Sequence, residues 1–187
     1  MKYVYLTTIL LVLALSAGPF IRPNFAGAAP AAEIDRNVTI ALEKLYAKSA
    51  KARTMGEKAK GILVFPSIVK GGFLVGGKYG EGALLKGGKT AGYYNAIQVS
   101  YGLQAGLQKY GYALFFMSDS AMNWLKKSDG WEIGVGPSIT VVDVGTATST
   151  TTTTLQSEIY AFFFDQKGLM GGLGLAGTKI TPISPGR

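Results

Sequence analysis

The chain has 187 residues, of which 48% are hydrophobic and 16% are charged, a composition that suits one globular domain with an apolar core. It contains no histidine and no cysteine, which excludes Ser-His-Asp and Cys-His catalysis, zinc and haem sites of the usual kinds, and disulfides. Nineteen basic and eleven acidic residues leave a net charge of +8, which favours a polyanionic partner.

Residues 1–28 are organised like a secretory signal peptide. Lys2 gives a positive start, residues 3–17 are mostly apolar, and Ala26-Gly27-Ala28 is a small-x-small cleavage site. The apolar stretch is short for a membrane span. We therefore expect cleavage after Ala28, with cleavage after Ala17 or Ala31 as alternatives. The expected product is exported to the periplasm or beyond, and it is not a lipoprotein because no cysteine is present to carry the lipid.

Residues 33–55 have the pattern of one amphipathic helix. The apolar positions recur with a period close to that of an α-helix and form one stripe: Ile34, Val38, Ala41, Leu42, Leu45, Ala52 and Met55. The basic residues are expected on the other side of the helix: Arg36, Lys44, Lys51, Arg53 and Lys58. This pattern fits a membrane-surface helix and equally a helix packed on a sheet. Both can hold if the apolar side docks on the sheet and the basic side meets a membrane, with Tyr46 at the headgroups.

The remainder of the chain has the pattern of short strands separated by glycines. We expect strands at 61–65, 73–75, 83–85, 96–101, 113–117, 139–142, 160–164 and 173–180. Pro66 is expected to end the first of them, and Gly87-Gly88 is expected to form a hairpin turn. Ser118 can cap a short helix that reaches about Lys127, and the threonines at 148–154 suit an edge strand. The predicted fold is α+β: a curved, largely antiparallel sheet, barrel- or sandwich-like, with an N-terminal amphipathic helix and a second short helix.

The basic excess is confined to one part of the sequence. Residues 36–89 hold eleven basic and three acidic residues, a net charge of +8, whereas residues 90–187 hold six of each. Such asymmetry indicates a polyanionic surface as the partner. An exported protein meets little nucleic acid, so anionic lipid headgroups fit better. The alternative is a basic face that only keeps the protein in solution.

Five glycine-containing blocks occur in a fixed order between Ala59 and Ile183. They are Ala59-Lys60-Gly61, Phe65-Pro66-x-x-x-Lys70-x-Gly72, Gly76-Gly77-x-x-Gly80-x-Gly82, Gly102-x-Gln104-x-Gly106 and Gly168-Leu169-x-x-Gly172. In these blocks the chain resembles the SYLF domain family, and at 93–96 it follows the bacterial branch of that family. The resemblance implies a lipid-binding module, whose binding in relatives is attributed to an N-terminal amphipathic helix and nearby basic residues. It divides the chain into a signal peptide (1–28), a helical segment (29–58), a β-rich core (59–183) and a tail (184–187).

These observations favour a non-catalytic protein that binds anionic phospholipid membranes, with no cofactor, no metal and no nucleic acid. The residues expected to contact the membrane are basic: Arg36, Lys44, Lys48, Lys51, Arg53, Lys58, Lys60, Lys70 and Lys78. One alternative is a carrier that holds a hydrophobic ligand inside a curled sheet. Others are an envelope structural or interaction protein and, more remotely, a hydrolase that uses Asp119 or Asp143. Surface binding should weaken with salt, whereas a carrier should be insensitive to it.

Overall fold

The computed structural model describes residues 29–72, 75–101, 106–127, 129–142, 144, 157–167 and 174–186. The predicted signal peptide, the predicted threonine-rich strand at 148–154 and the last glycine block at 168–172 lie outside the described residues. So do 102–105 of the fourth block, 73–74 of the predicted strand at 73–75, and Asp143. Near the two ends of the described chain, the Gly186 amide donates to the Ala29 carbonyl over 3.1 Å.

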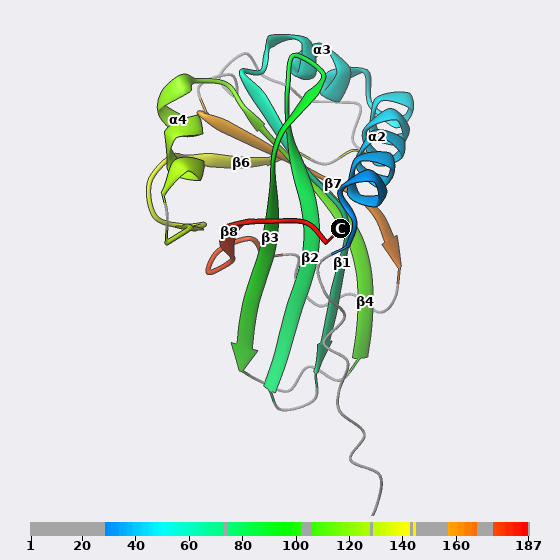
Figure 1. Cartoon of the computed structure of the whole chain (residues 1–187), viewed down its shortest axis with the longest axis vertical. Helices are drawn as coiled ribbons and strands as arrows, with labels where there is room; N and C mark the ends of the chain where they lie inside the picture. Colours follow the sequence, from blue (N-terminus) through cyan, green and yellow to red (C-terminus); the bar gives the residue numbers. More distant parts are fainter. Residues whose placement is uncertain are drawn as a thin grey trace, which may run out of the picture.

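The described residues form one curled sheet that carries two N-terminal helices (Figure 1). The helices are α2 (Ala31–Lys48), α3 (Ala50–Lys58) and α4 (Asp119–Asn123), which the 3-10 turn η2 (Trp124–Lys126) extends. The sheet order is β5-β8-β3-β2-β1-β4-β7-β6, and only β6 runs parallel to its neighbour. The strands are β1 (Gly61–Gly72), β2 (Val75–Lys86), β3 (Lys89–Tyr101), β4 (Gly106–Phe116), β5 (Trp131–Glu132), β6 (Ile139–Val142), β7 (Ile159–Lys167) and β8 (Lys179–Ile183).

The α+β fold, the curved and largely antiparallel sheet and the second short helix are confirmed. The Gly87-Gly88 turn is confirmed as well, with φ angles of 55° and 76° that glycine adopts without strain. The predicted strand at 173–180 is wrong for most of its length, because β8 begins only at Lys179. Residues 174–178 instead form a loop across the sheet.

The predicted single helix is two helices, because Ser49 interrupts it. Ser49 is extended, with φ −140° and ψ 102°, and its side chain accepts a hydrogen bond from the Ala52 amide over 3.1 Å. That geometry is a helix N-cap, which satisfies one of the amide groups left free at the start of a helix. The prediction of one continuous helix missed the competing hydrogen bond that a serine side chain offers the backbone.

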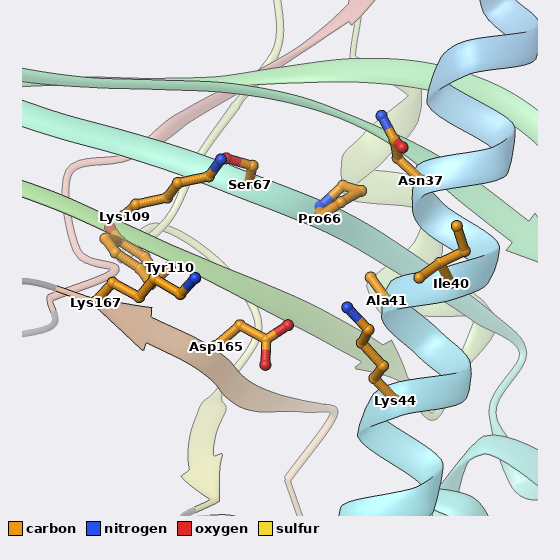
Figure 2. A pocket seen from close by; sticks show the side chains of 10 residues that line it. All are labelled: Asn37, Ile40, Ala41, Lys44, Pro66, Ser67, Lys109, Tyr110, Asp165 and Lys167. Carbon is orange, nitrogen blue, oxygen red and sulfur yellow. The ribbon is translucent and has the colours of Figure 1, made fainter.

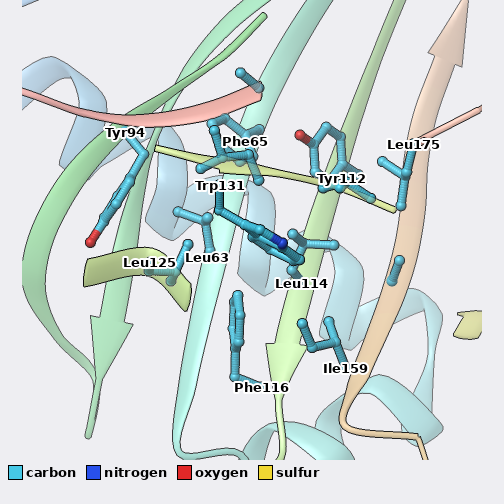
Figure 3. Close-up of a cluster of buried hydrophobic side chains, with 14 of the residues drawn as sticks. Leu63, Phe65, Tyr94, Tyr112, Leu114, Phe116, Leu125, Trp131, Ile159 and Leu175 are labelled. Carbon is cyan, nitrogen blue, oxygen red and sulfur yellow. The ribbon is translucent and has the colours of Figure 1, made fainter. Parts of the chain in front are cut away.

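The sheet is covered on both faces. On one face, here called the helix face, Ile34, Val38 and Leu45 of α2 pack against the strands, so the docked alternative for this helix is confirmed. On the opposite, inner face, Trp131 and Leu125 pack among strand residues such as Phe116 (Figure 3). Both clusters are closely packed aliphatic and aromatic side chains, and their removal from water is the main stabilisation of the fold.

A bulge in β1 changes which side chains face the helices. The pairing with β4 shifts between Phe65 and Ile68, so β1 holds one more residue than its neighbour there. Pro66 lies in the bulge, and since proline has no N–H it cannot complete a ladder of hydrogen bonds. The strand predicted to end at Pro66 therefore continues to Gly72. Before the bulge Val64 lies on the helix face, and after it Val69 does.

Two glycines of β2 provide a test of this bulge. A Cβ on Gly82 would overlap the Val64 carbonyl oxygen and lie 2.9 Å from the Phe65 ring, whereas a Cβ on Gly77 would meet nothing closer than 3.6 Å. Gly82→Ala should therefore destabilise the protein by about 1–3 kcal/mol, the usual effect of overpacking. Gly77→Ala in the same strand should change stability little. Chemical denaturation of both variants checks this, and equal stabilities would contradict the close approach.

Candidate functional site

The structure distributes the nine predicted membrane-contact residues over three places. Arg36, Lys44 and Lys48 lie exposed on α2. A second group lies on α3 and directly after it: Lys51, Arg53, Lys58 and Lys60. Lys70 and Lys78 lie on β1 and β2, facing away from the helices. The nine residues therefore do not share one surface, and the three places have to be considered separately.

The two helices do not present their cations on one side. At 100° per residue, Lys51 and Arg53 point about 200° apart around the axis of α3. The Arg53 guanidinium stacks on the Tyr46 ring, 5.4 Å from its centre. Partial burial, helped by the negative charge of Glu57 and opposed by the positive charge of Arg53, raises the pKa of Tyr46 above its ordinary value. Tyr46 is thus already packed within the protein, as are Ile34 and Val38, so insertion of these residues into a membrane is not available in this fold.

Lys70 and Lys78 are cross-strand partners on the inner face. Lys78 is only 4% exposed, and its ammonium donates a hydrogen bond to the Gly174 carbonyl over 2.7 Å. Burial, with a smaller contribution from Lys70, lowers the pKa of Lys78 to about 8. The Gln98 side chain donates to the Ala176 carbonyl over 2.8 Å. Together these contacts hold the 174–178 loop, so Lys78 has a structural position rather than a place on an exposed surface.

A cleft of about 450 Å³ lies between α2 and the sheet, at the bulge in β1 (Figure 2). Three lysines from different elements line it, Lys44 of α2, Lys109 of β4 and Lys167 of β7, together with Asp165. The Asp165 carboxylate accepts a hydrogen bond from Lys48 over 2.9 Å. That bond, opposed by partial burial and helped by the charges of Lys48, Lys44 and Lys167, lowers the pKa of Asp165. The cleft is the place where cations from distant parts of the sequence converge.

Beyond the end of α2, no helix of the described residues covers the helix face of β1–β4 (Figure 1). One row of the ladder runs from Lys109 through Val69, Tyr79 and Ile97 to Lys179, so an apolar centre has a lysine at each end; Lys167 lies opposite Lys109, and Glu132 lies opposite Lys179. The apolar members of this row are 41–48% exposed. In the adjacent row, two further side chains are 59% and 71% exposed: Val99 and Leu107. We call these five apolar residues the apolar patch.

Tyr79 carries a polar group at the margin of the apolar patch. Its hydroxyl donates to Glu81, whose second carboxylate oxygen accepts from the Ala29 amide over 3.0 Å. Partial burial and Glu81 raise the pKa of Tyr79 to about 12. The phenol therefore stays neutral at any physiological pH. An apolar ring with a hydrogen-bonded neutral hydroxyl suits the boundary between apolar and aqueous surroundings.

Sequence reasoning missed Lys109, Lys167, Lys179 and the apolar patch. Counting charge along the chain assigned the basic character to residues 36–89, but antiparallel pairing sets Lys109 directly opposite Lys167, outside that range. Most apolar residues in strands are buried, so the residue types of the apolar patch do not by themselves indicate exposure. The available signal was the glycine content of the pairing partners, since Gly71 and Gly77 leave Val99 and Leu107 without large neighbours.

The described ranges contain no group of three or more acidic, histidine or cysteine side chains arranged to hold a metal ion. In those ranges there is likewise no helix with the length and apolar character needed to cross a bilayer.

Comparison with known proteins gives one family. Residues 97–184 match the model of the Ysc84 family, described as Las17-binding protein actin regulator, which is the SYLF domain. The match begins in β3 and ends just after β8, so it includes the last two glycine blocks and leaves the first three outside. No curated protein matches the chain.

The buried Lys78 predicts an unusual dependence of stability on pH. Its pKa is about 8 in the folded protein and near 10.5 when unfolded, so between these values the unfolded chain binds more protons and stability rises with pH. From pH 7.5 to 9.5 the free energy of unfolding should gain roughly 2 kcal/mol from this residue. Lys78→Met should lose that gain, and the exposed Lys86→Met should keep it. Urea denaturation at both pH values measures the difference, and identical slopes for all three proteins would refute the assignment.

Proposed function

Residues 97–184 belong to the Ysc84 (SYLF) family, and from this premise we propose that the protein is a non-catalytic module that binds anionic phospholipid membranes. The family is linked to binding of lipids or of actin regulators. The observation that carries the proposal is the apolar patch with Lys109 and Lys179 at the two ends of its central row. Apolar side chains bordered by lysines match the boundary between acyl chains and anionic headgroups.

The exposed cations supply the attraction toward the membrane. Each lysine or arginine held near an anionic bilayer contributes about 1 kcal/mol at physiological salt. The range of this attraction is about 10 Å at 0.1 M salt, so the residues on α2 and α3 act without touching lipid. Arg36, Lys44, Lys48, Lys51, Arg53, Lys58 and Lys60 serve in this way in the proposal, and a solvated basic face alone would bind only weakly.

The apolar patch supplies the contact with the acyl boundary. Complete burial of a valine, leucine or isoleucine side chain contributes about 1.5–3 kcal/mol, and these side chains start from partial exposure. The sequence left open whether the apolar side of the first helix packs on the sheet or enters the membrane. Since Ile34, Val38 and Leu45 are committed to the core, the sheet takes this part in the proposal.

The proposed setting is the bacterial envelope. The signal-peptide pattern of residues 1–28 supports export, and peripheral attachment to an anionic leaflet needs no lipid anchor. The carrier alternative is less well supported, because the inner face, where a carried ligand would lie, is filled by side chains such as Trp131, Tyr112 and Phe116 (Figure 3). Experiment can distinguish the membrane-binding module from an envelope interaction protein, since the latter would bind its partner without lipid.

Charging the apolar patch should abolish membrane binding. The assay is liposome flotation with about 30 mol% phosphatidylserine. Val99→Asp/Leu107→Asp should reduce binding at least tenfold, because the lost apolar area and the new negative charges both oppose binding. The matched control is Val135→Asp/Val141→Asp, which adds the same charge at two side chains that are 57% and 56% exposed elsewhere. If both double variants float alike, only net charge matters and the patch has no role.

Reversing the cations near α3 should weaken the attraction. Lys51→Glu/Lys58→Glu/Lys60→Glu removes three positive charges at exposed or half-exposed positions, which predicts a loss of roughly 100-fold or more in vesicle affinity. The same measurement with neutral phosphatidylcholine vesicles should show weak binding for both proteins. Raising the salt should lower the wild-type affinity toward that of the variant. Wild-type flotation that is unaffected by the reversal and by salt would contradict the proposal.

A further inference from the structure

The short segment before α2 is held in place by a carboxylate of β2. The Ala29 nitrogen donates a hydrogen bond to Glu81 over 3.0 Å, and the Ala29 carbonyl accepts one from the Gly186 amide over 3.1 Å. The Ala29 side chain is half-buried and packs against the apolar cluster of the helix face. The nitrogen of this residue is therefore fixed next to the Glu81 carboxylate by contacts on three sides.

Glu81 has no cationic partner in the described part of the chain. The ion pair found there joins Lys48 to Asp165, and both hydrogen bonds that Glu81 accepts come from neutral donors, the Tyr79 hydroxyl and the Ala29 amide. The Glu81 side chain is half-buried, and water and salt screen a partly buried charge much less than an exposed one. A positive charge on the Ala29 nitrogen would therefore be stabilised at this position.

A second acceptor beside Glu81 lacks a donor. Asn95 lies directly opposite Glu81 in the ladder of β2 and β3, so the two side chains share the helix face. The Asn95 Oδ1 atom is buried, and no described residue donates a hydrogen bond to it. Buried acceptors without a donor are uncommon in proteins because they are costly. As part of a peptide bond the Ala29 nitrogen has a single hydrogen, and Glu81 already accepts it.

We infer that Glu81 and Asn95 form a binding site for the free N-terminus that arises when the bond between Ala28 and Ala29 is cleaved. A signal peptidase hydrolyses this bond with one water molecule. The oxygen of the water enters the new Ala28 carboxylate, and both of its hydrogens end on the Ala29 nitrogen, which becomes an ammonium group. This ammonium has three hydrogens, which serve the Glu81 carboxylate, the Asn95 Oδ1 atom and water. The bond to Glu81 then joins two charged groups and is stronger than the bond made by the amide.

The same contacts distinguish among the three cleavage positions that the sequence allows. Cleavage after Ala31 would remove Pro30, whose carbonyl accepts two amide hydrogen bonds from the first turn of α2. Cleavage after Ala17 would leave eleven residues before Ala29, whose nitrogen would stay an uncharged amide. Cleavage after Ala28 keeps the first turn of the helix intact and brings the new charge to the waiting carboxylate.

This inference goes beyond membrane binding and rests on the predicted export of the chain. The two meet at one residue, because the carboxylate that receives the N-terminus also accepts the hydrogen bond of Tyr79. Tyr79 belongs to the apolar patch, so the ammonium of Ala29 neutralises a negative charge at the margin of the proposed membrane contact. Proteolytic maturation thus completes this surface without moving a strand.

The test follows the new N-terminus itself. The full chain is produced in a bacterium that has a signal peptidase, and the exported product is purified and its mass is measured. NMR of protein with ¹³C-labelled alanine then follows Ala29 as its ammonium loses a proton with rising pH. Wild type is compared with Glu81→Gln, which removes the charge and keeps an acceptor, with Asn95→Ala, and with Glu43→Gln, which removes an exposed carboxylate of α2 as the matched control. Thermal unfolding shows that each variant is folded.

The measured mass should be that of residues 29–187. In wild type the pKa of the Ala29 ammonium should lie about one pH unit or more above the ordinary value of about 7.7–8.0, because an adjacent carboxylate favours the charged form. Glu81→Gln should return the pKa to about 8, and Asn95→Ala should lower it in part. Glu43→Gln should keep the wild-type value.

Three results would overturn the inference. The first is a product that begins at Gly18 or Ala32 or that retains Met1. The second is a wild-type ammonium that titrates at the ordinary value, and the third is an elevated pKa that neither Glu81→Gln nor Asn95→Ala lowers. These measurements contain no lipid, so the inference can fail while the proposed membrane binding stands, and flotation can fail while the N-terminal site stands.

Discussion

Two β-bulges that line the same cleft determine how the rest of the molecule is arranged. The bulge of β1 contains Pro66 and Ser67, and that of β7 contains Asp165. An extra residue bends a strand and increases its twist, so the sheet departs from α2 at the level where both bulges occur. Above them the helix and the sheet share an apolar core. Below them the helix face is open, and it carries the apolar patch.

The packing of α2 explains why the proposed membrane contact is assigned to the sheet. A helix has one apolar stripe, and that of α2 is buried against strand residues including Val64 and Phe115. Undocking the helix to insert it would expose this cluster to water, at a cost comparable to the stability of a whole domain of this size. A contact through the pre-exposed apolar patch requires no such opening. The helix keeps its exposed cations, which attract an anionic surface without any rearrangement.

The fold class could be predicted from the sequence because it depends on local patterns of residues. The candidate site could not be predicted in this way, because it depends on how the strands pair. The period of the apolar residues predicted which side of α2 is buried, and Gly87-Gly88 predicted the turn between β2 and β3. The break at Ser49 depends on one side-chain hydrogen bond, which periodicity does not reveal. The burial of Lys78 and the meeting of Lys44, Lys109 and Lys167 depend on register and on two bulges. A shift of one residue changes the face of every following side chain, so such features are fixed only by the assembled sheet.

The described ladder contains three cross-strand lysine pairs, and their surroundings resolve the repulsion in three ways. Lys86 and Lys89 lie beside the hairpin turn, where water and salt screen their charges. Lys78, opposite Lys70, is buried. Desolvation and, to a smaller extent, repulsion by Lys70 lower its pKa to about 8, so the ammonium group loses its proton more readily. Lys109 and Lys167 are exposed as well, and the charge of Lys167 also acts on the nearby Asp165, whose pKa it helps to lower. Charge counted along the sequence would treat the three pairs alike, whereas register and burial distinguish them.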